Sequence, residues 1–260
     1  LHVGGDETCH HDATVMFGQT GLEKFTGKGR IHLDQGTILG TQEAARIKPR
    51  GLQPQLIEDR GHQARGPDFA VANHFSLAVN PEGTRFLINP NGRHFARITA
   101  SSLIEIDAND PETMNRPDAP DPTAWGLHGS IHRALPHARC VMHVHSIHAT
   151  VLASLADSTL PPIDQNTAMF FNRHVVDAHY GGMAFAEEGA RCAAMLADPQ
   201  ITTMIMGNHG VLIIGRTVAE TFNRLTYFER AAETYIRALQ TGRPLRVLSD
   251  EVAEKTAQEW

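Results

Sequence analysis

The stretch CVMHVH, residues 140–145, places two imidazoles in an apolar run, and GNHG, residues 207–210, brings a third much later in the chain. In an extended strand the side chains at positions i and i+2 leave the same face, so His143 and His145 point together. Imidazoles buried among apolar neighbours are costly to desolvate unless they have a partner. Two such imidazoles, with His209 on a glycine-flanked turn, are typical of a three-histidine metal site. We therefore predict that His143, His145 and His209 share one metal ion.

The segments around this stretch alternate between strand and helix patterns. Thr123 is expected to cap a helix with the apolar stripe Leu127, Ile131 and Leu135, which Pro136 ends. Upstream, a turn at residues 80–83 joins two runs as a hairpin. The remaining expected elements are strands over 73–79, 85–89, 103–107, 201–206 and 211–214, and helices over 149–155 and 187–197.

The longest expected helix begins at a capping box formed by Thr217 and Glu220 and ends before Gly242. Its apolar stripe consists of Val218, Phe222, Leu225, Tyr235 and Leu239. Because strands and helices alternate along both halves of the chain, the pattern predicts one α/β domain in which helices cover a mixed sheet. We divide the chain into an N-terminal extension wrapping the core (1–65), the main domain (66–245) and a C-terminal tail (246–260).

Composition excludes several classes of function. The chain has 260 residues, 41% of them hydrophobic and 20% charged, with a net charge of −6. This charge gives no electrostatic footprint for nucleic acid or an anionic membrane. No apolar stretch approaches the roughly 18 to 20 residues that span a bilayer. The three cysteines (Cys9, Cys140 and Cys192) lie far apart without a CxxC motif, which favours a reducing cytoplasm.

Three further histidines lie close to the predicted site in sequence. His128 and His132 are four residues apart and share one face of the expected helix. The segment lacks the Glu of an H-E-x-x-H motif, so we expect both to pack against the metal strand. His148 follows His145 by three residues, and it is predicted either to support the site or contact substrate, or to be a solvated surface residue.

Six segments carry a shared pattern: residues 72–76 (ANHFS), 88–92 (INPNG), 98–103 (ITASSL), 125–145, 207–211 (GNHGV) and 215–220 (GRTVAE). Taken together, they resemble the class II aldolase/adducin superfamily over about residues 70 to 240. The resemblance implies a three-layer α/β/α fold around a central mixed, largely antiparallel sheet. It also implies one divalent metal held by the three histidines, and a homotetramer with active sites between subunits.

The chain departs from the sugar-phosphate aldolases of this family at their catalytic positions. The aldolase Glu directly precedes the helix tryptophan, where this chain has Ala124. The aldolases' phosphate-binding hydroxyls correspond to Pro122 and Thr123, another such position is Asn91, and the aldolase Tyr falls near Gln165. Cleavage of sugar phosphates is therefore not expected. Adducin has lost the metal histidines, so their retention here favours chemistry over scaffolding.

The leading hypothesis is a metal-dependent carbon–carbon lyase, a decarboxylase or aldolase type, acting on a non-phosphorylated 2-oxo or 2-hydroxy acid. Imidazole ligands suit Zn2+ or Fe2+, with Mn2+ as a further option, and open coordination positions let the ion polarise a carbonyl. The predicted catalytic residues are His148, Asp164, Gln165 and Tyr180, and the predicted substrate-binding residues are Asn73, Asn91 and Arg173.

Two alternatives remain open. The first is a mononuclear non-haem iron oxygenase that oxidatively decarboxylates an aromatic 2-oxo acid, as aldolase-like proteins of aminocoumarin biosynthesis do. Oxygen dependence separates it from the lyase. The second is a non-enzymatic, adducin-like oligomer whose metal is structural, which a closed fourth coordination position would support.

Overall fold

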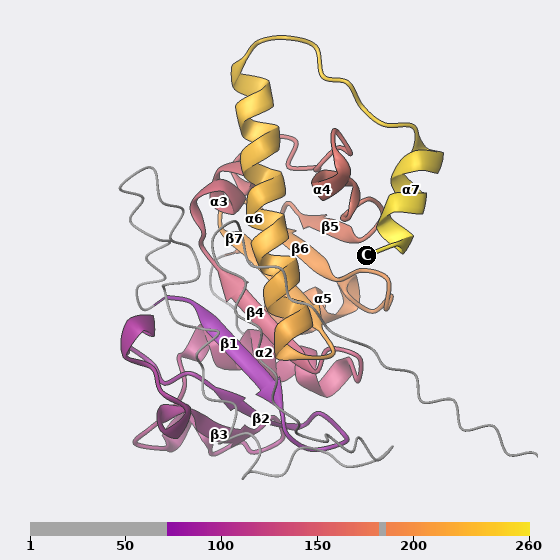
Figure 1. The fold of residues 1–260 in the computed structure, drawn as a ribbon. Helices are drawn as coiled ribbons and strands as arrows, with labels where there is room; N and C mark the ends of the chain where they lie inside the picture. Colours follow the sequence, from indigo (N-terminus) through magenta and orange to yellow (C-terminus); the bar gives the residue numbers. More distant parts are fainter. Residues whose placement is uncertain (1–71, 182–185) are drawn as a thin grey trace, which may run out of the picture. The chain divides into compact units, whose positions relative to one another are not determined.

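A computed structural model describes residues 72–181 and 186–260, so the predicted N-terminal extension over 1–65 lies outside the described residues (Figure 1). Short 3-10 turns occur at Phe95–Arg97, Ala100–Ser102 and Thr113–Asn115. The strands are β1 (His74–Ala78), β2 (Arg85–Ile88), β3 (Ile104–Asp107), β4 (Cys140–Val144), β5 (His174–Asp177), β6 (Thr203–Met206) and β7 (Gly210–Gly215). The helices are α2 (Pro122–Ala134), α3 (Ile147–Ala153), α4 (Gln165–Ala168), α5 (Ala186–Met195), α6 (Val218–Gln240) and α7 (Asp250–Gln258).

The seven strands form one sheet in the order β3-β2-β1-β4-β7-β6-β5. Every neighbouring pair is antiparallel except β5 and β6, which run parallel. The expected mixed, largely antiparallel sheet is therefore confirmed. β4 carries His143 at the middle of this order, between β1 and β7.

Helices cover both faces of the sheet, which confirms the three-layer α/β/α architecture (Figure 1). α3, α4 and α6 pack on the face to which β4 presents Met142 and Val144. α2 and α5 pack on the opposite face, to which β4 presents Val141. Side chains alternate along the strand, so His143 lies on the α2 side. The site is therefore set between the sheet and α2.

Two expected features of the helix ends differ in the structure. α2 is capped by Asp121, not by Thr123, because the Asp121 carboxylate accepts the backbone N–H groups of Thr123 and Ala124 and Pro122 fits the first turn. The Thr217 hydroxyl does accept the N–H of Glu220. The Glu220 carboxylate instead accepts the N–H of Arg216, one residue before the expected partner.

The apolar stripe of α6 ends earlier than its sequence pattern predicts. Leu225 is buried, whereas Leu239 is 41% exposed, because the last turn of α6 extends beyond the sheet (Figure 1). The α2 stripe is confirmed in full, since Leu127, Ile131 and Leu135 are all buried.

α2 and α5 approach so closely that a glycine is required at their contact. A Cβ atom added to Gly189 would lie 2.1 Å from the carbonyl oxygen of Gly126 and 2.7 Å from the Ser130 hydroxyl. Both distances are far below van der Waals contact, so no side chain fits there. The backbone of α5 therefore rests directly on the backbone of α2.

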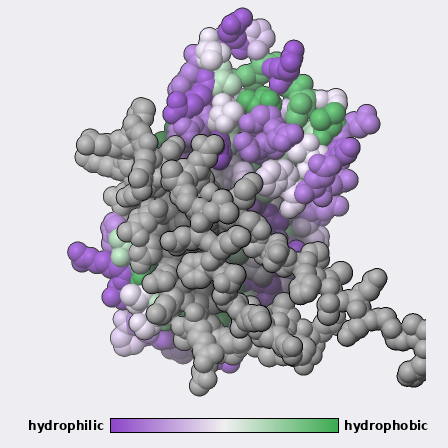
Figure 2. Space-filling view, in the orientation of Figure 1, coloured by the Kyte–Doolittle hydropathy of each residue, from purple (hydrophilic) through white to green (hydrophobic). Residues whose placement is uncertain are grey.

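The expected C-terminal tail contains a helix, α7, which Ser249 caps. An ion pair between Arg173 and Glu254, 2.6 Å apart, ties α7 to the segment after α4. Figure 2 shows hydrophobic residues gathered on the upper part of the face in view. Val247, before α7, and Val252, within α7, are both exposed. In the described residues no helix is both long and apolar enough to cross a membrane.

Candidate metal centre

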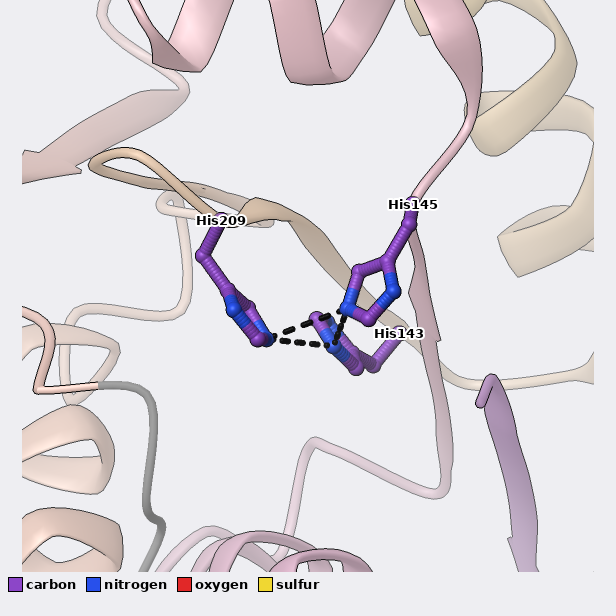
Figure 3. A group of neighbouring side chains, drawn as sticks. All are labelled: His143, His145 and His209. Carbon is purple, nitrogen blue, oxygen red and sulfur yellow. Dashed lines mark hydrogen bonds between the residues drawn. The ribbon is translucent and has the colours of Figure 1, made fainter. Parts of the chain in front are cut away.

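Three histidines from two chain segments converge at one end of β4 (Figure 3). His143 lies within β4 and is buried, while His145 follows the last strand residue and is the most exposed of the three. His209 lies on the turn between β6 and β7. Because β7 pairs with β4, placing Val211 opposite Val144, the turn is delivered to the end of β4. The structure thus brings the three predicted ligands together.

The turn that carries His209 depends on the two residues beside it. Asn208 has a φ of 55°, in the left-handed region that Asn tolerates better than most residues. A Cβ on Gly210 would lie 2.4 Å from the carbonyl oxygen of Val144 and 2.9 Å from the His145 ring. Glycine at 210 therefore lets β7 approach the histidine strand closely enough for the three rings to meet.

The three Nε2 atoms form a nearly equilateral triangle. The separations are 3.0 Å between His143 and His145, 3.1 Å between His145 and His209, and 3.2 Å between His209 and His143. Nitrogens bound to one ion at about 2.0–2.1 Å lie roughly 3 Å apart, so the spacing fits a shared ion. Among the described residues, these are the ones whose donor atoms come close enough to share an ion.

Protonation of the triad also fits a cation. A neutral imidazole Nε2 either donates a proton or offers a lone pair, so three contacts in a triangle cannot all be hydrogen bonds. The Val211 carbonyl lies 3.1 Å from Nδ1 of His143 and can only accept, which leaves a lone pair on Nε2. Burial lowers the pKa of His143 well below its usual value and that of His209 to about 4, so both are neutral at pH 7. Lone pairs on the three Nε2 atoms, turned towards one point, could together hold a cation.

The triad forms part of a cavity of about 90 Å³. Its described lining contains no Lys or Arg, and its one carboxylate is Asp121. Sequence reasoning predicted Tyr180 here, but it assigned no cavity role to His74, Asp121, Thr123 or Leu127. The lining residues are Ala72, His74, Asp121, Thr123, Leu127, His143, His145, Tyr180 and His209.

Tyr180 packs its ring 4.6 Å from that of His209. Burial raises the pKa of the Tyr180 phenol, so it stays protonated at neutral pH and can donate a proton. The loop that carries it is held by Arg191, which pairs with Asp177 and with Glu188, both at 2.6 Å. Asp177 also accepts the N–H of His179 and Glu188 that of Gly181, so this network fixes both sides of Tyr180.

Asn73, predicted to bind substrate, contacts one of the three predicted metal ligands. Its side-chain oxygen accepts the backbone N–H of His145 at 2.9 Å. Asn89 in turn donates its amide to the Asn73 carbonyl and accepts the N–H of Phe75. The two asparagines thus fix the backbone at the point where His145 leaves the strand.

His128 and His132 are both buried, as expected, but their hydrogen-bond partner lies on β1, the neighbour of the strand β4 against which they were expected to pack. The Ser76 hydroxyl bridges them, 2.6 Å from Nδ1 of His128 and 2.8 Å from Nε2 of His132. His74 links this pair to the triad, because its ring lies edge-on to His128 and stacks on His143 at 5.8 Å. Burial lowers the pKa of His132 to about 3 and that of His74 to about 4, so these rings are neutral.

His148 lies beside the site but not in the cavity lining. Its Nδ1 is 2.9 Å from Glu229 of α6. The same carboxylate accepts the Ser146 hydroxyl and the backbone N–H groups of His148 and Ala149. Glu229 therefore caps α3 from another helix, a role that no local pattern in the sequence indicates.

The other predicted site residues lie outside this cavity. Asp164 caps α4 by accepting the N–H of Thr167, and Gln165 is exposed on the same helix. The Arg173 guanidinium is engaged by Glu254. Asn91 lies exposed on the turn after β2. The roles predicted for these four residues therefore stay predictions, and the cavity around the triad does not include them.

Known proteins resemble this chain in sequence. A sequence model described as Class II Aldolase and Adducin N-terminal domain matches residues 60–236. The decarboxylase NovR of Streptomyces niveus is 28% identical over 190 residues, 73% of this chain and 69% of that protein. The 4-hydroxy-3-prenylphenylpyruvate oxygenase/4-hydroxy-3-prenylbenzoate synthase of Streptomyces roseochromogenus subsp. oscitans is 29% identical over 149 residues, covering 57% and 53% respectively.

Solved structures share the fold. The crystal structure of an aldolase II superfamily protein from Pseudomonas syringae matches with a TM-score of 0.66 and 26% identity. The match covers 85% of this chain and 83% of that one.

Proposed function

This chain belongs to the class II aldolase and adducin family, and on that premise we propose that it is a metal-dependent carbon–carbon lyase acting on a non-phosphorylated 2-oxo or 2-hydroxy acid. The observation that carries the proposal is the triangle of Nε2 atoms, 3.0–3.2 Å apart, on His143, His145 and His209. The similarity to a decarboxylase supports the same class of reaction.

The residues around the triad suit this chemistry. A divalent cation on the triad would polarise a carbonyl and stabilise negative charge as a C–C bond breaks. The Tyr180 phenol, protonated and next to His209, can give a proton to the carbanionic carbon. Ala72 and Leu127 form an apolar part of the cavity lining, which limits the water that reaches the site.

The cavity also favours a substrate without phosphate. Its described lining offers no Lys or Arg, and Asp121 brings a negative charge that would repel a phosphate dianion. Ala124, at the position of the aldolase Glu, packs with Phe86 and Ile88 in an apolar cluster instead of lining the cavity. Neither phosphate binding nor the aldolase acid–base residue is therefore provided at those positions.

A second candidate is an iron oxygenase. It is favoured by the similarity to the prenylphenylpyruvate oxygenase, and imidazoles are also suitable ligands for Fe2+. His143, His145 and His209 would hold the Fe2+, which would supply the redox chemistry of an oxidative decarboxylation.

Metal analysis and oxygen uptake separate the candidates. We would purify the chain anaerobically from its native host, measure bound metals, and then add aliphatic and aromatic 2-oxo acids while recording oxygen and products. Zinc or manganese near one per chain, with cleavage and no oxygen uptake, supports the lyase. Iron with substrate-triggered oxygen consumption supports the oxygenase instead.

Histidine variants test whether the triad holds that metal. His143→Ala, His145→Ala and His209→Ala should each lower the metal content from about one ion per chain towards zero, because each removes one of three protein ligands. His94→Ala, at an exposed histidine outside the cavity, is the matched control and should keep its metal. A His143→Ala/His145→Ala double variant that still holds one metal per chain would refute the site.

A further inference from the structure

The cavity contains a carboxylate that the proposed function leaves without a role. Asp121 precedes α2 and lines the cavity together with the metal triad. Its Oδ1 atom accepts the N–H and the hydroxyl of Thr123, at 2.9 and 2.5 Å, and caps the helix. Across the described residues, Oδ2 of Asp121 makes no hydrogen bond or ion pair, so it is available to a ligand.

The Asp121 carboxylate is ionised at neutral pH. Partial burial opposes its ionisation, but hydrogen bonds from the Thr123 hydroxyl and from the backbone N–H groups of Thr123 and Ala124 hold its pKa below the usual value. His74 Nε2 lies 3.8 Å from Oδ1, which is too long for a hydrogen bond. His74 is itself neutral, because burial lowers its pKa to about 4. The negative charge of Asp121 is therefore not neutralised by His74.

Asp121 does not belong to the group that could share the ion. The described donor atoms close enough to one another for that purpose come from His143, His145 and His209. A free, ionised carboxylate near these ligands would repel a second substrate carboxylate and attract a hydrogen-bond donor. Asp121 therefore favours a substrate that has a hydrogen-bond donor, and not a second carboxylate, at the end that does not chelate the metal.

From this placement, and resting on the lyase function proposed above, we infer that Asp121 binds a substrate hydroxyl and accepts its proton during cleavage. The substrate class is then a 2-oxo acid with a hydroxyl on the carbon beyond the bond that breaks, a 4-hydroxy-2-oxo acid. Asp121 takes the place of the Glu that is missing at Ala124, from three residues earlier in the chain.

The step balances as a retro-aldol cleavage. The Asp121 carboxylate takes the proton from the 4-hydroxyl, whose oxygen forms a C=O double bond. The C3–C4 bond breaks, and its electron pair passes into the enolate of the three-carbon 2-oxo acid. A proton from Tyr180 or solvent then adds to C3, Asp121 returns its proton to solvent, and Tyr180 regains from solvent any proton that it gave. An aldehyde and a 2-oxo acid leave, and no oxidant or reductant is consumed.

Binding of uncleavable ligands tests the inference without relying on turnover. 2,4-Dihydroxypentanoate and 2-hydroxypentanoate both present a carboxylate and a 2-hydroxyl to the ion, and both lack the carbonyl needed for cleavage. Zinc-loaded wild-type protein should bind the dihydroxy acid about tenfold more tightly by calorimetry, as expected for a hydrogen bond to a charged acceptor. Asp121→Asn should reduce this preference to about twofold or less.

Asn caps helices as well as Asp does, so Asp121→Asn should fold and keep its metal. Asp118→Asn is the matched control, because Asp118 is exposed, lies on the same segment and pairs with Arg116. It should keep the wild-type preference. With 4-hydroxy-2-oxopentanoate, Asp121→Asn should also lower kcat by about 10²–10⁴-fold, typical of removing a general base.

The outcomes separate the two proposals. If wild type binds neither metal nor any of these acids, the lyase function fails. If wild type binds metal and cleaves a 2-oxo acid, but binds the two probes equally and tolerates Asp121→Asn, only the role of Asp121 is overturned.

Discussion

Ser76 joins two buried imidazoles by a single hydroxyl, and this arrangement determines how the protein responds to acid. His128 and His132 each use one ring nitrogen on Ser76. Their other ring nitrogens, Nε2 of His128 and Nδ1 of His132, meet no hydrogen-bond partner among the described residues. Protonating either ring would bury a charge without a counterion, which is strongly unfavourable. Both residues must therefore be neutral in the folded protein.

The metal-free protein should lose stability as the pH falls below about 6.5. An unfolded histidine binds a proton near that pH, whereas burial lowers the pKa of His132 to about 3. Between these values the unfolded state binds the extra proton, so stability is complete above pH 6.5 and declines at up to about 1.4 kcal/mol per pH unit for this residue. Urea unfolding of apoprotein at pH 7.5, 6 and 5 measures the slope.

His132→Gln provides the comparison, because Gln can still hydrogen-bond Ser76 but does not titrate. Its unfolding free energy should fall less steeply than that of wild type, by about 1.4 kcal/mol per pH unit. Equal slopes in the two proteins would show that His132 is accessible to protons in the folded state.

At the residue scale, the sequence predicted the members of the triad but not the whole cavity. An H-x-H spacing on a strand implies a shared face from chain geometry alone. His74 and Asp121 reach the cavity only because β1 pairs with β4 and α2 packs over both. Those contacts are tertiary, so no local pattern reports them. Arg173, which was predicted to bind substrate, pairs with Glu254, and no local pattern reports this partner because it lies 81 residues further along the chain.

Among the elements, α3 is unusual because its N-terminus is capped from α6. Its own N-cap residue, Ser146, makes no side-chain capping bond, and Glu229 accepts the N–H groups of His148 and Ala149 instead. A carboxylate at this end also complements the helix dipole. The short helix therefore depends on α6 for its start, and it begins two residues after His145.

Glu229→Gln should both destabilise the fold and weaken metal binding. The amide oxygen can replace only part of the hydrogen bonding of the carboxylate, and we expect a cost of about 1–2 kcal/mol in urea unfolding. Displacement of the adjacent His145 backbone should weaken zinc binding about tenfold in a competitive titration. Glu251→Gln, at an exposed glutamate on α7, is the control and should change neither quantity appreciably. Unchanged zinc affinity in Glu229→Gln would show that α3 does not position His145.

Prediction of the elements succeeded where they are long or strongly patterned. The hairpin of β1 and β2, the strand β4 and the helix α6 follow directly from alternation, turn residues and periodicity. α4 and β5 have four residues each and show little periodicity, and α7 has few apolar residues on its face. These elements are held by sheet pairing, by Asp164 and by Glu254, which a single sequence does not reveal.

For the whole molecule, the family resemblance predicts a homotetramer with sites between subunits. One exposed apolar pair is consistent with a contact near the site, since Ile147 is 65% and Val151 is 41% exposed and both lie on one face of α3. Light scattering should give the mass of four 28.5 kDa chains, about 114 kDa. Ile147→Asp should lower this mass, because it places a charge in the contact.

Val247→Asp serves as the control for that experiment. Val247 is 53% exposed on the segment before α7, away from α3, so its replacement should leave the mass unchanged. A wild-type mass near that of one chain would refute the predicted tetramer. A tetramer that persists in Ile147→Asp would show that its subunit contacts do not involve Ile147.

The contact between Gly126 and Gly189 makes the geometry of the cavity depend on residues that do not line it. α2 and its N-cap residue bring Asp121, Thr123 and Leu127 into the cavity, and the position of α2 is set by the contact of its backbone with that of α5. A single methyl group at residue 189 would have to displace α2, and with it the three cavity residues. Substitution of Gly189 on α5 should therefore be tolerated as poorly as substitution of the predicted metal ligands. Harmful substitutions are therefore expected at the contact between Gly126 and Gly189 as well as in the cavity lining.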